Sequence, residues 1–78
     1  MLSPNYYAGW NHAVNQMSAD MVSRKDFVRS LATYEAVLEY KSHGQDFYQG
    51  VTDAVAAYQG NRRIPIQVEI KSVSFFKR

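Results

Sequence analysis

Apolar side chains recur at steps of three and four residues over most of this chain, the spacing of one face of an α-helix. The first such series is Tyr7, Trp10, Val14, Met17 and Met21. It follows a Ser-Pro pair at positions 3 and 4, which is typical of a helix start, with serine as the cap and proline in the first turn. The pattern predicts a first helix over residues 4–22.

Two further series predict two further helices. Phe27, Leu31, Tyr34 and Leu38 predict a helix over residues 24–43. Ser23 is expected to cap it, with Asp26 completing a weak capping box, and Gly44 is expected to end it. Phe47 or Tyr48, Val51, Val55 and Tyr58 predict a helix over residues 46–59. Here Asp46 and Gln49 have the capping-box spacing, and Gly60-Asn61 is expected to end the helix.

The period of the pattern changes after residue 61. Ile64, Ile66, Val68 and Ile70 alternate with more polar residues, as in a half-buried β-strand, and predict an extended segment over residues 63–76. A strand needs partners for its backbone N–H and C=O groups. Three solutions stay open: a short hairpin with its own C-terminal end, pairing with a second copy in a homodimer, or pairing with the sheet edge of another protein. The fold class expected is therefore mostly α: one small domain over residues 1–78, with three helices and a C-terminal strand or short hairpin.

Residues 6–15 and 47–56 resemble each other at an offset of 41 positions. Four of the ten aligned positions are identical, among them Gly9 with Gly50 and Ala13 with Ala54. Glycine inside a helix costs about 1 kcal/mol relative to alanine, so two glycines at matching places indicate a packing need. We expect the first and third helices to cross closely at these small residues. His12 and Asp53 also match, and such a crossing could bring their side chains within hydrogen-bond distance.

The composition excludes several classes of protein. The chain has no cysteine, which removes disulfides, thiolate metal sites and cysteine nucleophiles. No apolar run is long enough for a membrane helix, and no secretory signal is recognisable. No phosphate-binding glycine loop, metal-ligand spacing or serine nucleophile motif occurs. We therefore expect a cytoplasmic protein that is not an enzyme and has no catalytic residue, metal or cofactor.

The 11 aromatic residues in 78 positions are more than a small core needs. Several are neighbours along the chain, so some rings must face outward. Exposed aromatic side chains are common anchors of protein–protein interfaces. The sequence predicts a partner-binding surface made of Tyr6, Tyr40, Tyr48 and Phe76, with Arg62 and Arg63 at its rim.

The net charge of +2 is too small to indicate a nucleic-acid binder by itself, but its distribution is uneven. Residues 62–78 carry five basic residues and one acidic residue. A second basic cluster lies at the predicted start of the second helix. The alternative prediction is a nucleic-acid-binding surface made of Arg24, Lys25, Arg62, Arg63, Lys77 and Arg78.

The short, cysteine-free, aromatic-rich chain resembles, in its general character, accessory proteins encoded by bacteriophages and other mobile elements. That resemblance implies a non-enzymatic protein that binds a host or defence protein in the host cytoplasm and inhibits or modulates it by steric occlusion. A nucleic-acid-binding protein is the first alternative. A self-assembling structural subunit, as a homo-oligomer, is the second.

Overall fold

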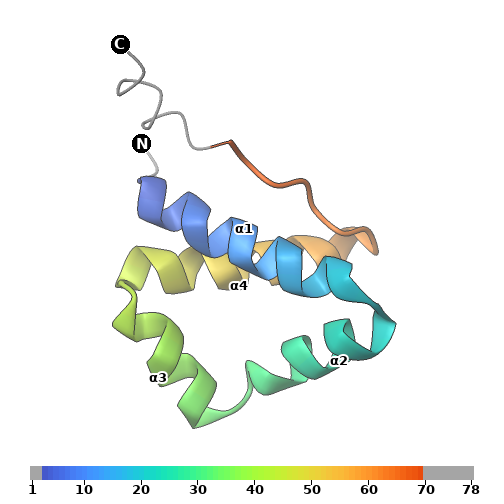
Figure 1. Ribbon diagram of the computed structural model, residues 1–78, viewed down its shortest axis with the longest axis horizontal. Helices are drawn as coiled ribbons and strands as arrows, with labels where there is room; N and C mark the ends of the chain where they lie inside the picture. Colours follow the sequence, from blue (N-terminus) through green and yellow to red (C-terminus); the bar gives the residue numbers. More distant parts are fainter. Residues whose placement is uncertain (1–2, 70–78) are drawn as a thin grey trace.

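The structure is a computed structural model that describes residues 3–69. Four helices account for most of this range (Figure 1): α1 (Pro4–Ala19), α2 (Met21–Ser30), α3 (Tyr34–Ser42) and α4 (Gln45–Asn61). The expected mostly α fold is confirmed, with one helix more than expected. No strand forms within residues 3–69.

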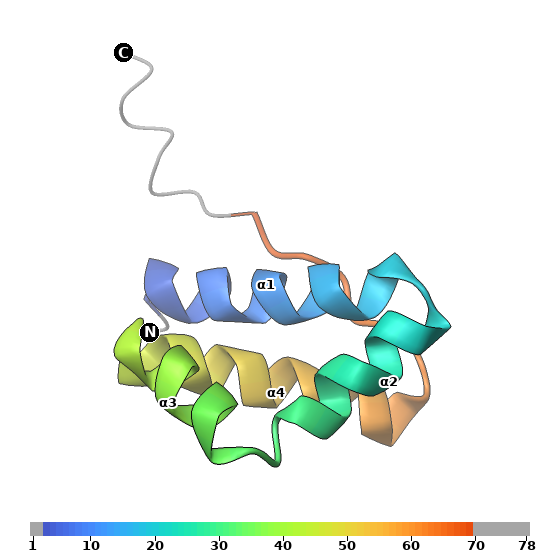
Figure 2. The same cartoon turned by 60° about the horizontal axis from the view of Figure 1, so that its bottom comes forward.

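Helices α1 and α4 form the centre of the fold, side by side and parallel, with both N-termini at the same end (Figures 1 and 2). Helices α2 and α3 carry the chain back from the C-terminal end of α1 to the N-terminal end of α4. They cover one side of the central pair. The buried core lies between these layers and consists of Ala13, Val14, Met17, Phe27, Val51, Ala54 and Val55.

The two glycines of the sequence repeat are the points of closest approach between α1 and α4. A Cβ atom added to Gly9 would lie 2.0 Å from the carbonyl oxygen of Phe47, and one added to Gly50 would lie 2.0 Å from that of Tyr6. These distances leave no room for any side chain. The expected close crossing of the repeated segments is confirmed, and it makes the two glycines obligatory for this packing.

The α1/α4 contact is reciprocal. Residue 9 touches residue 47, and residue 50 touches residue 6, so each contact maps onto the other through the offset of 41. The same offset joins Asn5 to Asp46, whose side chains are hydrogen-bonded across the pair, Nδ2 to Oδ1, at 2.7 Å. The Ser3 hydroxyl donates to the same carboxylate at 2.5 Å. These two donors lower the pKa of Asp46 and tie the N-terminal ends of the two helices together.

The predicted helix over residues 24–43 is wrong, because the chain breaks at residues 31–33. Thr33 is extended, and its hydroxyl accepts from the backbone N–H of Ala36 at 3.3 Å and donates to the Ser30 carbonyl at 2.6 Å. One threonine thus ends α2 and caps α3. An unbroken 20-residue helix would be about 30 Å long, at 1.5 Å per residue, whereas α1 beside it measures about 24 Å. The bend shortens the α2–α3 segment, so that its length matches that of the α1/α4 pair that it covers.

Four predicted helix ends are also wrong in detail: the end of the first predicted helix, the start of the second and both ends of the third. Helix α1 stops at Ala19 because Asp20 is extended; its carboxylate, rather than Ser23, caps α2 by accepting from the Ser23 N–H at 2.7 Å. That bond lowers the pKa of Asp20. At α4, Gly44 precedes the helix without a side-chain cap, and Asp46 and Gln49 do not form a capping box. The C-cap of α4 is Arg62, in the left-handed conformation at φ 60°.

The described part of the predicted extended segment is residues 63–69; Arg63 lies in a bend, and residues 64–69 are extended but pair with no strand among the described residues. They run back along α1 on the side opposite α2 and α3 (Figure 2). The Trp10 indole N–H donates to the Ile66 carbonyl at 2.9 Å, and the Asn11 side-chain amide both donates to and accepts from the Val68 backbone at 2.6 Å. Side chains of α1 thus form hydrogen bonds with backbone groups of residues 64–69 that a neighbouring strand would otherwise have bonded. The rest of the predicted segment lies outside the described residues, and the homodimer stays a prediction.

Candidate binding surface

Of the four predicted aromatic anchors, Tyr6 is not on the surface. Its side chain is buried, at 8% exposure, and its hydroxyl donates to the Asp53 carboxylate of α4 at 2.6 Å. Burial and this hydrogen bond raise the pKa of Tyr6 to about 12. The prediction of Tyr6 as a partner-binding residue is therefore wrong; it is part of the α1/α4 contact.

Tyr40 and Tyr48 are partly buried and already have partners within the chain. Tyr40 of α3 packs against Phe27 and Phe47, with ring centroids 6.4 and 6.2 Å away, and burial raises its pKa. The Tyr48 ring has the Lys41 ammonium 5.2 Å from its centroid. Both rings are better explained as packing between α3 and α4 than as free anchors. The fourth predicted anchor, Phe76, lies outside the described residues.

The histidine and carboxylate of the repeat do not meet. The His12 imidazole turns toward α3, where its Nε2 lies 3.2 Å from the Tyr40 hydroxyl. Burial, and to a smaller extent the nearby charge of His43, lowers the pKa of His12. Asp53 pairs instead with Tyr6 and, at 2.8 Å, with the Gln49 amide. The arrangement offers no acid–base pair between α1 and α4.

Most basic side chains of residues 3–69 lie along α2 or directly after α4, toward the end of the molecule at which α1 and α4 finish. Five of the six Lys and Arg residues within residues 3–69 belong to α2 or follow α4: Arg24, Lys25, Arg29, Arg62 and Arg63. We call this set the basic end. The C-terminal ends of the parallel helices α1 and α4 lie here, and their aligned dipoles favour cations at this place.

Arg24 links the three helices of the basic end. Its Nε donates to the Met17 carbonyl in the last turn of α1 at 2.9 Å, and its guanidinium carbon lies 5.7 Å from the centroid of the Tyr58 ring of α4. The Arg29 side chain, by contrast, is exposed, and its ion pair with the equally exposed Asp26 is long, at 3.9 Å. Arg24 is thus partly structural, whereas Lys25 and Arg29 are exposed charges.

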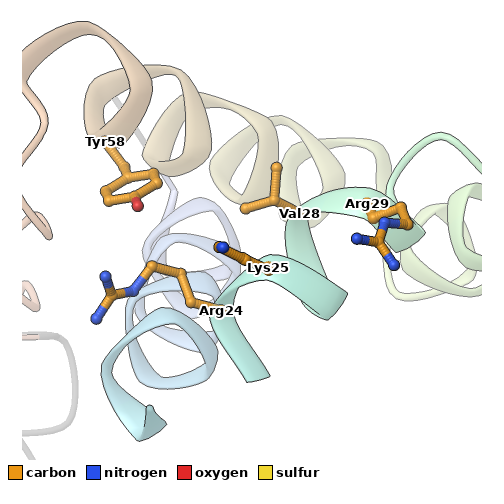
Figure 3. A pocket seen from close by; sticks show the side chains of 5 residues that line it. All are labelled: Arg24, Lys25, Val28, Arg29 and Tyr58. Atoms are coloured by element: carbon orange, nitrogen blue, oxygen red, sulfur yellow. The ribbon is translucent and has the colours of Figure 1, made fainter. Parts of the chain in front are cut away.

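A hollow of about 270 Å³ opens between α2 and α4 at the basic end (Figure 3). Arg24, Lys25, Val28 and Arg29 from α2 and Tyr58 from α4 line it. Val28 and Tyr58 pack against the core. The hollow therefore has an apolar wall of aliphatic carbon and one aromatic ring, with cationic groups around it. We call it the basic pocket.

Arg62 and Arg63 are exposed, and Arg63 lines a second hollow together with Ala57, Asn61, Ile64 and Pro65. The structure thus brings four of the six predicted nucleic-acid contacts, Arg24, Lys25, Arg62 and Arg63, to one end of the molecule. Lys77 and Arg78 lie outside the described residues. Val28 and Tyr58 also line the pocket, although neither was predicted as a site residue; the helical spacing of Tyr58 marked it only as core.

The largest exposed apolar side chains are not those that the sequence indicated. Tyr34 and Leu38, expected in the core stripe of the second helix, are 75% and 49% exposed, and Met21, expected on the stripe of the first helix, is 61% exposed. Val22 and Ile66 are exposed as well. The break at residues 31–33 and the early end of α1 are the reasons, since both rotate these positions away from the core.

Other kinds of site have no support in the described residues. No cluster of three or more His, Asp or Glu side chains suited to a metal ion occurs between residues 3 and 69. None of the four helices is both long enough and apolar enough to cross a membrane. Searches for related proteins found no matching family model, no matching curated protein and no matching solved structure.

Proposed function

We propose that this protein is a non-enzymatic binding module that holds a partner protein at its basic end. The observation that carries the proposal is a preformed hollow that three cationic side chains of α2 line, with Arg62 and Arg63 following α4 at the same end of the rigid helix pair. Anchors in preformed hollows lose little conformational entropy on binding. Binding would occlude the partner surface that the basic end covers, and the proposed location is the cytoplasm, including that of a host cell if a phage encodes the protein.

The proposal revises which residues make the contact. Tyr6 and Tyr40 support the fold, so the aromatic part of the interface falls to Tyr58, while Arg62 and Arg63 keep the rim position predicted for them. Exposed charges at a rim chiefly set the association rate and the choice of partner. A positive rim selects a partner that is acidic at this place.

Nucleic-acid binding is the second candidate, because the same cations lie beside an aromatic ring. One observation favours a protein: residues 3–69 carry six basic and seven acidic residues, so this part of the chain has no excess of positive charge to attract a phosphate backbone.

The test is affinity capture from a lysate of the source cell, with and without nuclease, using tagged wild-type protein and two charge-reversal variants. Lys25→Glu combined with Arg62→Glu and Arg63→Glu reverses three of the four exposed cations of the basic end, and Lys41→Glu is a control charge reversal away from the basic end. We expect one stoichiometric, nuclease-resistant protein with wild type and with the control, and its loss with the triple variant. Capture that disappears on nuclease treatment would establish the nucleic-acid candidate instead, and equal capture by the triple variant would refute a role for the basic end.

A further inference from the structure

We infer that the basic pocket is the anchor site for one apolar side chain of an acidic peptide segment in the partner. The inference rests on the proposed function and specifies what chemistry the basic end recognises. It joins two properties of the same hollow, its apolar wall and its cationic surroundings, that a simple charged patch would not combine.

The size of the hollow points to a single side chain. At about 270 Å³ it lies at or below the lower limit of pockets for whole small molecules, which span roughly 300–1,000 Å³. Anchor residues of protein interfaces fill pockets of this kind near the centre of the contact, with polar groups around them. A Leu, Met or Phe side chain can be buried there against the Tyr58 ring and the Val28 methyl groups.

The apolar and the cationic groups that line the basic pocket lie at different depths. Val28 and Tyr58 pack against the core, whereas Lys25 and Arg29 are exposed. An entering side chain therefore meets carbon at the bottom of the pocket, and the residues on either side of it meet cations at the mouth. Aspartate or glutamate on both sides of the apolar residue is the complementary sequence.

Lys25 is the cation best placed to select for acidity. Arg24 is held by the Met17 carbonyl and by the Tyr58 ring, and Arg29 faces Asp26 at 3.9 Å. No hydrogen bond or ion pair within the described residues engages the Lys25 ammonium, and Figure 3 shows it beside Tyr58 and Val28. Its charge is free to pair with a carboxylate of the partner.

The experiment measures binding of short fluorescent peptides to the full chain. The main probe is Asp-Glu-Phe-Asp-Glu; the matched probes replace the central Phe by Ala, or the four acidic residues by Asn and Gln. An oligodeoxythymidine serves as the nucleic-acid probe. We expect the main probe to bind, and each matched probe to bind about tenfold more weakly, a difference of about 1.4 kcal/mol, because one lacks the buried anchor and the other lacks all four charges.

Variants then place the binding in the pocket. Val28→Phe fills the hollow and is expected to abolish binding of the main probe, while Val22→Phe, on the exposed face of the same helix, leaves it unchanged. Because Val28→Phe could disturb packing, Lys25→Gln provides a second test at an exposed position, with an expected loss of about two- to fivefold in affinity. On the wild-type protein, NMR shift changes upon titration should centre on Val28 and Tyr58.

Three results would overturn the inference: equal binding of the Phe and Ala probes, unchanged binding by folded Val28→Phe, or displacement of the main probe by the oligodeoxythymidine at equal concentration. The captured partner separates this failure from that of the proposed function. If Val28→Phe still captures it and the triple charge variant does not, the basic end binds the partner without the pocket. If both variants capture it, the proposed function fails as well.

Discussion

The α1/α4 pair and the α2/α3 return span the same length of the molecule by different means. In the pair, glycines let two backbones touch, and the side chains around them are buried. In the α2/α3 segment, Phe27 is the one buried residue of α2, and α3 has no buried residue. Regions with few buried apolar contacts open at lower free energy than a packed core. The pair is thus the rigid frame, and α3 is the element that the frame holds most loosely.

The largest expected effect is on the close contact itself. Gly50→Ala would place a Cβ atom 2.0 Å from the Tyr6 carbonyl oxygen, which is backbone and cannot rotate away. Moving α4 aside should cost about 3 kcal/mol or more of unfolding free energy. The better helix propensity of alanine, about 1 kcal/mol, offsets only part of this cost.

Gly60→Ala is the matched control for that substitution, since nothing lies within 4 Å of its added Cβ in the same helix. Urea unfolding should show Gly60→Ala equal to wild type or slightly more stable. Equal stability of the two alanine variants would show that α1 and α4 do not touch at Gly50.

A smaller loss of unfolding free energy is expected when the hydrogen bond between Tyr6 of α1 and Asp53 of α4 is removed. Tyr6→Phe removes the hydrogen bond to Asp53 and should lower the unfolding free energy by about 1 kcal/mol at neutral pH. Since the pKa of Tyr6 is raised from 10 to about 12, its bond stabilises the fold fully below pH 10 and is lost as pH rises toward 12. Between pH 10 and pH 12 the unfolding free energy of wild type, measured by chemical denaturation, should therefore fall more than that of Tyr6→Phe. Equal pH dependence of the two proteins would contradict the hydrogen bond between Tyr6 and Asp53.

The His12 contact with α3 tests the looser region. Because burial lowers the pKa of His12 below 6.5, the neutral imidazole is favoured in the folded protein, and protonation favours unfolding. Stability should fall as pH drops below 6.5, and hydrogen exchange should rise first in α3, where Tyr40 meets the imidazole. In His12→Phe the response of α3 to pH should be reduced. A response that persists unchanged would assign it to another group.

The smallest effect is expected at the exposed face of α3. Tyr34→Ser should change the unfolding free energy by no more than about 0.5 kcal/mol, because the side chain is 75% exposed. Phe27→Ala, at the position seven residues earlier that is 6% exposed, should cost about 3–5 kcal/mol. If urea unfolding showed comparable losses of unfolding free energy for Tyr34→Ser and Phe27→Ala, the result would support the continuous helix that the residue spacing predicted.

These two regions also differ in how well the sequence predicted them. The α1/α4 contact was predictable because Gly9 and Gly50 are costly in a helix and recur in the same local pattern. The bend between α2 and α3 was not, because Leu31 and Tyr34 continue the helical spacing through it. Only Thr33 indicates the break in the sequence, because its hydroxyl can cap a helix. Whether the chain bends there depends on the length of the α1/α4 pair that α2 and α3 must cover.

The candidate site was predictable in charge but not in shape. Arg24, Lys25, Arg62 and Arg63 were identifiable as basic clusters, yet only the fold brings α2 and the end of α4 together. The aromatic prediction failed at Tyr6 because neighbouring rings show that one must turn away from the other without showing which. The Tyr58 position depended on a contact between segments more than 30 residues apart, which no local pattern encodes.

The reciprocal glycine contact has a consequence for synthesis of the chain. Gly9 leaves the ribosome 41 residues before Gly50, so the face of α1 that becomes most tightly covered waits longest for its partner. Closing such a distant contact is slower than forming neighbouring ones. Until α4 is complete, α1 has only local neighbours to shield its apolar face, and the nascent chain is most vulnerable to aggregation and proteolysis during this interval.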